Sequence, residues 1–427
     1  MTRNILILQG PIGPFMGRFA KDLRTHGFTV YKVNFNGGDQ VCYRGPNPLA
    51  YTGRPDDFPE YLKNLLQSLN IERIYLFGDT RLHHEQARRV SRELGVRVFV
   101  FEEGYLRPDY LTLEEDGVNA YSVLPRDPEF YRPWENANFV KPKRIQNGFA
   151  FMAMWAVIYY IAASLLRWKY PYYRHHRPLN VLGEGSRWIL GFLYKIPHAV
   201  MSRIFTRWLL NRHRKNYFLV PLQVHCDGQI LRHSQFDSVA EFIQEVIRSF
   251  AKYSSKKHLL VIKHHPLDRP YHNYRRLIRN AAKAQGVDGR VFYVHDLHLP
   301  TLLEHALGTI LINSTVGLSS LYHDTPVIAL SNSVYNIPGL THQGSLASFW
   351  KHPGIVDFRL NKAFRSYLIA HNQINGSFYR CLPGTLTHSG LVFPTDLWKQ
   401  HIGVMNPAQN RGSFLAQSFA AETAASD

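Results

Sequence analysis

Apolar residues follow two alternating patterns over the first 140 residues. Short apolar runs predict buried strands at 5–8, 28–34, 73–77 and 96–101. Stretches of helical pattern between them predict helices at 18–26, 58–69 and 83–94. Strands that alternate with helices are typical of βαβ units and a parallel sheet. Residues 1–140 are therefore expected to form one α/β lobe.

The same alternation resumes near residue 215. Strands are predicted at 217–220, 259–263, 291–294 and 309–312, and helices at 242–253, 274–285 and 299–305. Residues 215–400 are expected to form a second lobe, and the small, polar residues 401–427 a flexible tail. A length of 427 residues suits two domains. The predicted fold class is α/β, with two Rossmann-like lobes.

Residues 141–214 follow a different pattern. Ser164 is the one polar residue in 149–166, a stretch at the lower length limit for a transmembrane helix. A second amphipathic stretch covers 187–210, and Glu184 is the one acidic residue between 141 and 226. We expect a basic, apolar, helical segment that associates with a membrane surface, because a single span would put the two lobes on opposite sides. A buried core helix is the alternative.

Charge and cysteine content narrow the setting. The formal net charge is +18, which favours phosphate-rich partners such as nucleotides or anionic lipids. Cys42, Cys226 and Cys381 are far apart and form no CxxC pair, so neither a disulfide framework nor a zinc site is indicated. The N-terminal apolar run is too short for a signal peptide. A cytoplasmic location is expected.

Two motifs in the first lobe are candidates for ligand binding or chemistry. QGPIGPF at 9–15 follows a predicted strand, where the amides of Gly10 and Gly13 can approach a ligand; a tight Gly/Pro turn is the alternative. Glu102 and Glu103 end the strand at 96–101, and ligands bind at strand carboxyl ends in open parallel sheets. Adjacent strand residues point to opposite faces, so one carboxylate is expected to face a cleft.

A polar cluster follows the first strand of the second lobe. It begins with Gln223 and includes Asp227, which precedes a glycine. An Asp-Gly pair is common in Asx-turns, which leaves a purely structural role open. An aspartate in such a loop is also a candidate nucleophile or base.

The strand at 259–263 ends in Lys263, His264, His265 and a proline. A lysine and histidines at a strand end suit a phosphate. A metal site is less favoured, because no HExxH pattern or spaced carboxylate accompanies the histidines.

The motif NSTVG follows the strand at 309–312. Asn313, Ser314, Thr315 and Gly317 lie where a helix begins, so hydroxyls and free amides there are suited to an anion. Helix capping is the alternative, and it is compatible with ligand binding.

Together these motifs resemble the KpsS/LipB-type capsule polysaccharide biosynthesis family over nearly the whole chain. The resemblance rests on QGPIGPF at 9–15, NFNGGD at 34–39, FGDTRLHH at 77–84, EEGYLRPD at 102–109, QVHCD at 223–227, KHHP at 263–266 and NSTVG at 313–317. It implies a GT-B-like enzyme with a cleft between its two lobes. The implied activity is retaining β-Kdo transfer from CMP-Kdo to a lyso-phosphatidylglycerol acceptor, starting the capsule glycolipid linker.

The resemblance also implies residue roles. Asp227 matches the family's nucleophilic aspartate, and His265 the residue near the nucleotide phosphate. The EEG sequence matches an E-D-G pattern that supplies the acid/base, but Glu103 stands where the pattern has aspartate, so either Glu102 or Glu103 is the candidate. KHHP likewise departs from a more usual K-P-H-P.

The implied reaction needs no cofactor and no metal. CMP leaves as an anion that cations and amides stabilise. The expected partners are a nucleotide sugar, an anionic phospholipid at the cytoplasmic face of the inner membrane, and other capsule assembly proteins. A non-catalytic export or assembly factor is the alternative. Nucleic acid is disfavoured, because the basic residues adjoin an apolar run.

Overall fold

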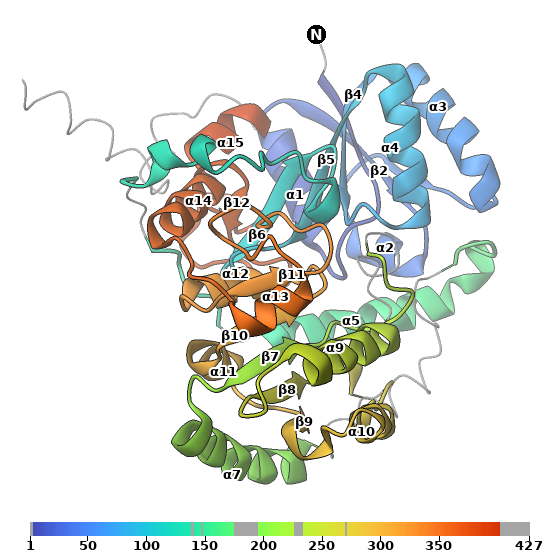
Figure 1. Cartoon of the computed structure of the whole chain (residues 1–427). Coiled ribbons are helices and arrows are strands. Elements are labelled where there is room, and N and C mark those ends of the chain that lie inside the picture. Colours follow the sequence, from blue (N-terminus) through green and yellow to red (C-terminus); the bar gives the residue numbers. More distant parts are fainter. Residues whose placement is uncertain are drawn as a thin grey trace, which may run out of the picture. The chain divides into compact units, whose positions relative to one another are not determined.

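The computed structural model describes residues 3–137, 141–146, 148–174, 195–225, 234–269 and 271–401. The chain forms two compact units (Figure 1). Unit 1 comprises Met1–Val123, Asn136–Val181 and Arg365–Asp427, and unit 2 comprises Leu124–Glu135 and Leu182–Phe364. The described residues of each unit form one sheet with helices, which confirms the prediction of two α/β lobes.

In the described part of the chain, unit 1 holds a seven-stranded sheet in the order β12-β6-β5-β4-β1-β2-β3. Strands β5, β4, β1, β2 and β3 are parallel, whereas β6 is antiparallel to β5 and β12 to β6. The strands are β1 (Arg3–Ile7), β2 (Phe28–Asn34), β3 (Pro48–Ala50), β4 (Ile71–Phe77), β5 (Arg97–Glu103), β6 (Tyr110–Glu115) and β12 (Gln373–Asn375).

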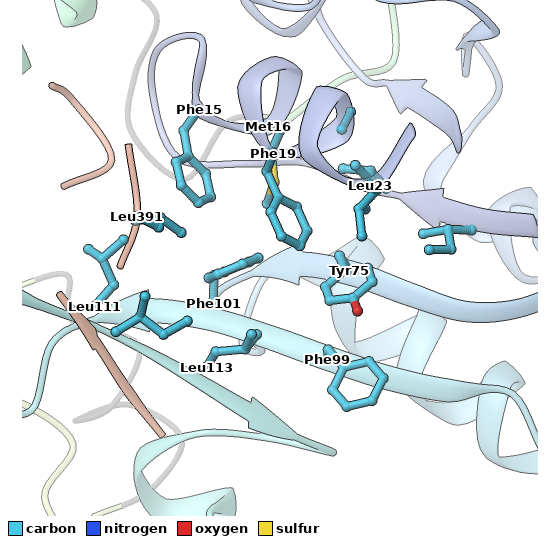
Figure 2. Packing of buried hydrophobic residues seen from close by; sticks show 14 of the residues in the cluster. Phe15, Met16, Phe19, Leu23, Tyr75, Phe99, Phe101, Leu111, Leu113 and Leu391 are labelled. Carbon is cyan, nitrogen blue, oxygen red and sulfur yellow. The ribbon is translucent and has the colours of Figure 1, made fainter. Parts of the chain in front are cut away.

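Both faces of this sheet are covered, because alternate strand residues are buried on opposite sides. Ile5 and Ile7 join a core with α1 (Phe15–Thr25), while Leu6 and Leu8 join another with α3 (Phe58–Ser68) and α4 (Leu82–Leu94). Figure 2 shows Phe15 and Phe19 of α1 directed at the aromatic residues of the sheet. The ring centroids of Phe19 and Phe101 are 5.0 Å apart.

The chain returns to unit 1 after residue 364, which corrects the predicted boundary of the second lobe at 215–400. The helix α14 (Phe358–His371) crosses the division, and β12 and α15 (Thr395–His401) follow it. Ile374 of β12 pairs with Leu111 and is buried in the same core as Phe15. Residues 124–135 instead belong to unit 2, where Arg132 forms an ion pair with Asp357 at 2.9 Å.

In the described residues, unit 2 holds a five-stranded parallel sheet in the order β11-β10-β7-β8-β9. Its strands are β7 (Tyr217–Pro221), β8 (Leu259–Lys263), β9 (Val291–Val294), β10 (Gly308–Leu311) and β11 (Val327–Ala329). One face packs on α9 (Val239–Tyr253), α10 (Arg275–Ala284) and α13 (Leu346–Lys351), and the other on α7 (Lys195–His213) and α11 (Leu299–His305). The short helix α12 (Val316–Tyr322) follows β10.

The expected separate segment at 141–214 is divided between the units. The apolar stretch forms α5 (Gly148–Leu165) in unit 1, whereas α7 lies in unit 2. Part of the predicted stretch at 187–210 lies outside the described residues. Helix α5 packs on the short helix α2 (Gly37–Cys42), whose glycines admit it closely. A Cβ atom on Gly37 would lie 2.2 Å from the carbonyl oxygen of Ala162.

Candidate functional site

The polar motifs of unit 2 all lie at the carboxyl ends of its parallel strands. Gln223 follows β7, Lys263 ends β8 and is followed by His264, and Asn313 follows β10. The carboxyl edge of an open parallel sheet is the usual place for a ligand. In the strand order β7 lies between β8 and β10, so the three motifs follow neighbouring strands.

Gln223 and Asn313 are brought together although 90 residues separate them. The Nε2 group of Gln223 donates to Oδ1 of Asn313 at 3.0 Å, and the backbone N–H of Asn313 donates to Oε1 of Gln223 at 3.3 Å. Both side chains are buried. The pair thus fixes the loop after β7 to the loop after β10.

The two histidines of the KHHP motif differ in environment. His264 is buried beside Tyr293, whose hydroxyl lies 2.7 Å from its Nδ1 atom. Burial, with a smaller contribution from His295, lowers the pKa of His264 to about 3, so its ring is neutral. His265 is partly exposed, and its Nδ1 atom accepts the backbone N–H of Leu267 at 3.2 Å. His265 is therefore the more accessible of the two.

Lys263 is a buried cation at the end of β8. Burial lowers the pKa of its ammonium group; Asp296 opposes that shift and Arg269 adds to it. Asp296 forms an ion pair with Arg269. A buried lysine close to a carboxylate retains its charge more readily than an isolated one.

The NSTVG motif forms the turn into α12. The hydroxyl of Ser314 accepts the backbone N–H of Val316 at 3.3 Å, which is a local turn bond. Thr315 precedes the helix and makes no side-chain capping bond. A Cβ atom on Gly317 would lie 2.3 Å from the Tyr335 ring, so close packing requires glycine there. The binding roles predicted for Ser314, Thr315 and Gly317 stay predictions.

A histidine–aspartate pair joins the QVHCD and KHHP motifs, and the sequence prediction missed it. The Nδ1 atom of His225 is hydrogen-bonded to Oδ1 of Asp268. Both residues lie in or next to motifs already singled out, but a separation of 43 residues gives no pattern that would reveal their contact. Asp227, the predicted nucleophile, lies outside the described residues.

The predicted carboxylates of unit 1 end β5 and have different partners. An oxygen of Glu102 accepts the backbone N–H of Glu103 at 2.9 Å, and an oxygen of Glu103 accepts the hydroxyl of Tyr379 at 3.1 Å. Burial, reinforced by the charges of Glu103 and Asp79, raises the pKa of Glu102 to about 7, although its backbone hydrogen bond and Arg107 oppose the shift. Glu102 thus exchanges a proton near neutral pH.

The glycines of the first loop are packed against side chains. A Cβ atom on Gly10 would lie 2.4 Å from Cγ of Met16, and one on Gly13 would lie 3.0 Å from the ring of Trp155 in α5. Gly13 also has a φ of +104°, which disfavours other residues. Packing therefore accounts for both glycines, and the approach of their amides to a ligand stays a prediction.

Helix α5 is also attached to this loop by buried hydrogen bonds that the sequence did not reveal. The hydroxyl of Tyr159 accepts from Nε2 of Gln9 at 3.0 Å and from Nδ2 of Asn36 at 2.7 Å. It donates to Oδ1 of Asp39 at 3.0 Å. All four residues are buried. We call this set the Tyr159 network.

Within the described ranges, no group of three or more His, Cys, Asp or Glu residues is placed to hold a metal ion.

Comparison with known proteins identifies relatives that cover most of the chain. A family model described as "Capsule polysaccharide biosynthesis protein" matches residues 72–379. The capsule polysaccharide export protein KpsS of Escherichia coli is 41% identical over 385 residues, which cover 88% of this chain and 97% of KpsS. The capsule polysaccharide modification protein LipB of Neisseria meningitidis serogroup A is 41% identical over 386 residues, covering 88% of this chain and 92% of LipB.

A solved structure, the β-Kdo 2,7 transferase of KpsC from Thermosulfurimonas dismutans, is also similar. It is 14% identical with a TM-score of 0.42, and the match covers 86% of this chain and 92% of that one.

Proposed function

Because the chain belongs to the capsule polysaccharide biosynthesis family, we propose that it is a retaining glycosyltransferase of capsule assembly. Its donor is CMP-Kdo, and its acceptor is the hydroxyl of a (lyso)phosphatidylglycerol at the cytoplasmic face of the inner membrane. The product is the first unit of a glycolipid linker. The observation that carries this proposal is the state of Glu102, a carboxyl group with a pKa of about 7 at a strand end.

Glu102 is the proposed acid/base. A general base works best when its pKa lies near the operating pH, because it is then both available and strong enough to remove a proton. The raised pKa favours Glu102 over Glu103, a choice that the sequence left open. The charge of Glu103, which accepts the hydroxyl of Tyr379, helps to raise the pKa of Glu102 toward neutrality.

The proposed reaction has two displacements at the anomeric carbon. A carboxylate oxygen of Asp227 attacks that carbon, and the bond to the phosphate oxygen of CMP breaks. The acceptor hydroxyl then displaces Asp227 from the opposite side while its proton passes to Glu102. Two inversions give net retention. The role of Asp227 rests on family resemblance.

The donor phosphate is proposed to bind at the carboxyl edge of the unit 2 sheet. A departing CMP carries negative charge, which cations and hydrogen-bond donors stabilise. Lys263 supplies a cation, and the accessible ring of His265 supplies a donor. Ser314 and Thr315 add hydroxyl groups at the end of β10.

The acceptor side is proposed to meet the membrane through α5. This helix is long and apolar enough to cross a bilayer. It leaves six large apolar side chains exposed: Phe149, Met154, Val157, Ile158, Ile161 and Leu165. The described residues from 141 to 174 include six Lys and Arg residues and no acidic ones. Such a combination suits an anionic lipid surface.

A surface position for α5 agrees better with its contacts than a full span does. Tyr159, Ala162 and Ala163, in its second half, are buried. The Tyr159 network and the close contact with Gly37 hold this half against unit 1. Crossing the bilayer would break those contacts, so we propose that the helix lies in the membrane interface. Trp168, which is 78% exposed, is a suitable interfacial residue.

The test is a transfer assay with purified full-length protein, CMP-Kdo and a lyso-phosphatidylglycerol analogue, read by mass spectrometry. Wild type should add the mass of one Kdo. Glu102→Gln should lower the rate by about 100-fold or more, because it removes the base. Glu103→Gln is the matched control, and its loss should be smaller.

Two outcomes would contradict the assignment. Equal losses in both variants would show that the pair acts as a structural unit. No Kdo addition by folded wild type would instead favour an export or assembly factor, the role named for its relative KpsS, which requires no acid/base.

A further inference from the structure

The ends of β7 and β8 are connected by more than their strand pairing. The backbone N–H of Leu222 donates to the carbonyl oxygen of Lys263 at 2.9 Å, which continues the ladder by one bond. Beyond it, the side chains of His225 and Asp268 meet. Asp268 ends the 3-10 turn Pro266–Asp268, and its backbone N–H donates to the carbonyl oxygen of His265 at 3.0 Å. The pair therefore lies at the proposed phosphate edge.

The chemistry of the pair fixes the proton on the histidine. The side chain of Asp268 is 1% exposed, and a buried carboxylate is costly unless a donor faces it. A carboxylate can only accept, so Nδ1 of His225 must carry the proton. This arrangement directs the second nitrogen, Nε2, away from Asp268.

The His225 ring is held in place and remains partly accessible. Its side chain is 30% exposed, in contrast to the buried His264. Its centroid lies 4.1 Å from that of His272 and 5.6 Å from that of Tyr271. Those two rings limit the rotation of the His225 ring while it is hydrogen-bonded to Asp268. A histidine that is oriented by a buried carboxylate but open to solvent is arranged to contact a ligand.

We propose that His225 is a ligand of the nucleotide phosphate and that Asp268 is its positioning residue. The proposal rests on the proposed function only in taking a nucleotide as the donor. A phosphate oxygen accepts from the Nε2–H group of the protonated ring, while the Nδ1–H group keeps its bond to Asp268.

His225 and His265 differ in the charge that they can bring to the phosphate. The Nδ1 atom of His265 accepts a backbone N–H, so its ring can hold a proton only on Nε2 without losing that bond. It is thus a neutral donor. The Nδ1 atom of His225 donates instead, so both nitrogens can carry protons with every bond kept. Of the two, His225 is the one able to act as a cation.

The experiment separates phosphate recognition from nucleoside recognition. The full-length protein is titrated calorimetrically with CMP, UMP and GMP and with the three corresponding nucleosides. A hydrogen bond to a charged group contributes enough to predict that His225→Gln weakens binding of the preferred nucleotide about ten- to a hundredfold. Its nucleoside should bind equally to wild type and variant. Asp268→Asn should produce the same phosphate-specific loss.

The control for a histidine-to-glutamine change is His352→Gln, an exposed residue of unit 2. It should bind both ligands as wild type does. Equal weakening of nucleotide and nucleoside by His225→Gln would show a structural role and overturn the proposal, as would no weakening at all. Melting curves show whether Asp268→Asn remains folded. If that variant is unfolded, the result for His225→Gln alone decides the proposal.

The outcomes also distinguish this proposal from the proposed function. Preference for UMP or GMP would contradict CMP-Kdo as donor, yet the phosphate-specific loss in His225→Gln would still support the ligand role. Phosphate-specific binding without Kdo transfer would contradict the proposed transferase activity but not the role of His225 as a phosphate ligand. Absence of binding by all three nucleotides to folded wild type would contradict both.

Discussion

Replacing Tyr159 by phenylalanine tests whether the Tyr159 network fastens α5 to unit 1. The substitution removes one hydroxyl and keeps the ring that packs on Gly38. Two buried groups lose their best partner. Asp39 Oδ1 is left with Gln9 Nε2 at 3.5 Å, and the Asn36 side chain is left with Asp39 Oδ2 at 3.5 Å and with its hydrogen bond to Tyr173. Gln9 keeps a good bond, to the hydroxyl of Tyr173 at 2.8 Å.

The expected cost follows from those two groups. A buried polar group left without a partner costs about 1–3 kcal/mol, and the remaining 3.5 Å contacts recover part of it. We expect Tyr159→Phe to lower the free energy of unfolding of unit 1 by about 3 kcal/mol. For a unit of this size that is a fall in melting temperature of roughly 6–12 °C.

Scanning calorimetry of the full chain measures this change, and hydrogen exchange in peptides from β1 and α5 assigns the transition to unit 1. Tyr172→Phe is the matched control, because Tyr172 is exposed and its ring contact with Arg54 survives in phenylalanine. It should change stability by less than about 0.5 kcal/mol. A melting temperature for Tyr159→Phe within about 1 °C of wild type would refute the reasoning.

Three further predictions concern α5 and Glu102. The folded-state pKa of Glu102, about 7, lies above its ordinary 4.5, so the folded chain binds this proton more tightly and loses stability as pH rises through that window. Glu102→Gln should therefore melt higher than wild type at pH 8 and about equally below pH 4.5, the ordinary pKa of the group; equal melting at both would contradict the raised pKa. Gly37→Ala should destabilise unit 1 by about 1–3 kcal/mol in thermal unfolding, because its Cβ meets a backbone carbonyl of α5. Gly148→Ala, whose Cβ makes an ordinary 3.6 Å contact, is the control, and equal stability of the two would contradict the close packing. Val157→Glu should reduce co-flotation with phosphatidylglycerol vesicles, whereas Val123→Glu, at a valine that is also exposed, should not; identical flotation would contradict a position of α5 at the lipid surface.

The strands and helices that carry a continuous apolar pattern could be predicted from the sequence. The bounds predicted for β2, β8, β9 and α11 agree with the structure residue for residue. These elements are long enough, or apolar enough, for local pattern to outweigh tertiary context. The grouping of polar motifs at strand carboxyl ends followed from the same parallel-sheet logic.

Elements stabilised by distant partners could not be predicted in this way. Strand β12 has three residues, and its pairing with β6 joins Ile374 to Leu111 across more than 250 residues. No local pattern marks it, so the lobe boundary was placed too late. The Tyr159 network and the His225–Asp268 pair have the same origin. A lone polar residue in an apolar helix, or a histidine in a loop, shows its partner only after the chain has folded.

The charges around Glu102 give a physical reason for its proposed role as the acid/base. Glu102 keeps a pKa near neutrality because burial and two neighbouring carboxylates act on it against a backbone hydrogen bond and one opposing cation, Arg107. A second cation at ion-pair distance would lower that pKa by about 1–3 and leave a weak base. Removing a neighbouring carboxylate by Glu103→Gln should likewise lower the pKa of Glu102 and move the pH midpoint of transfer downward, and an unchanged midpoint would contradict this account.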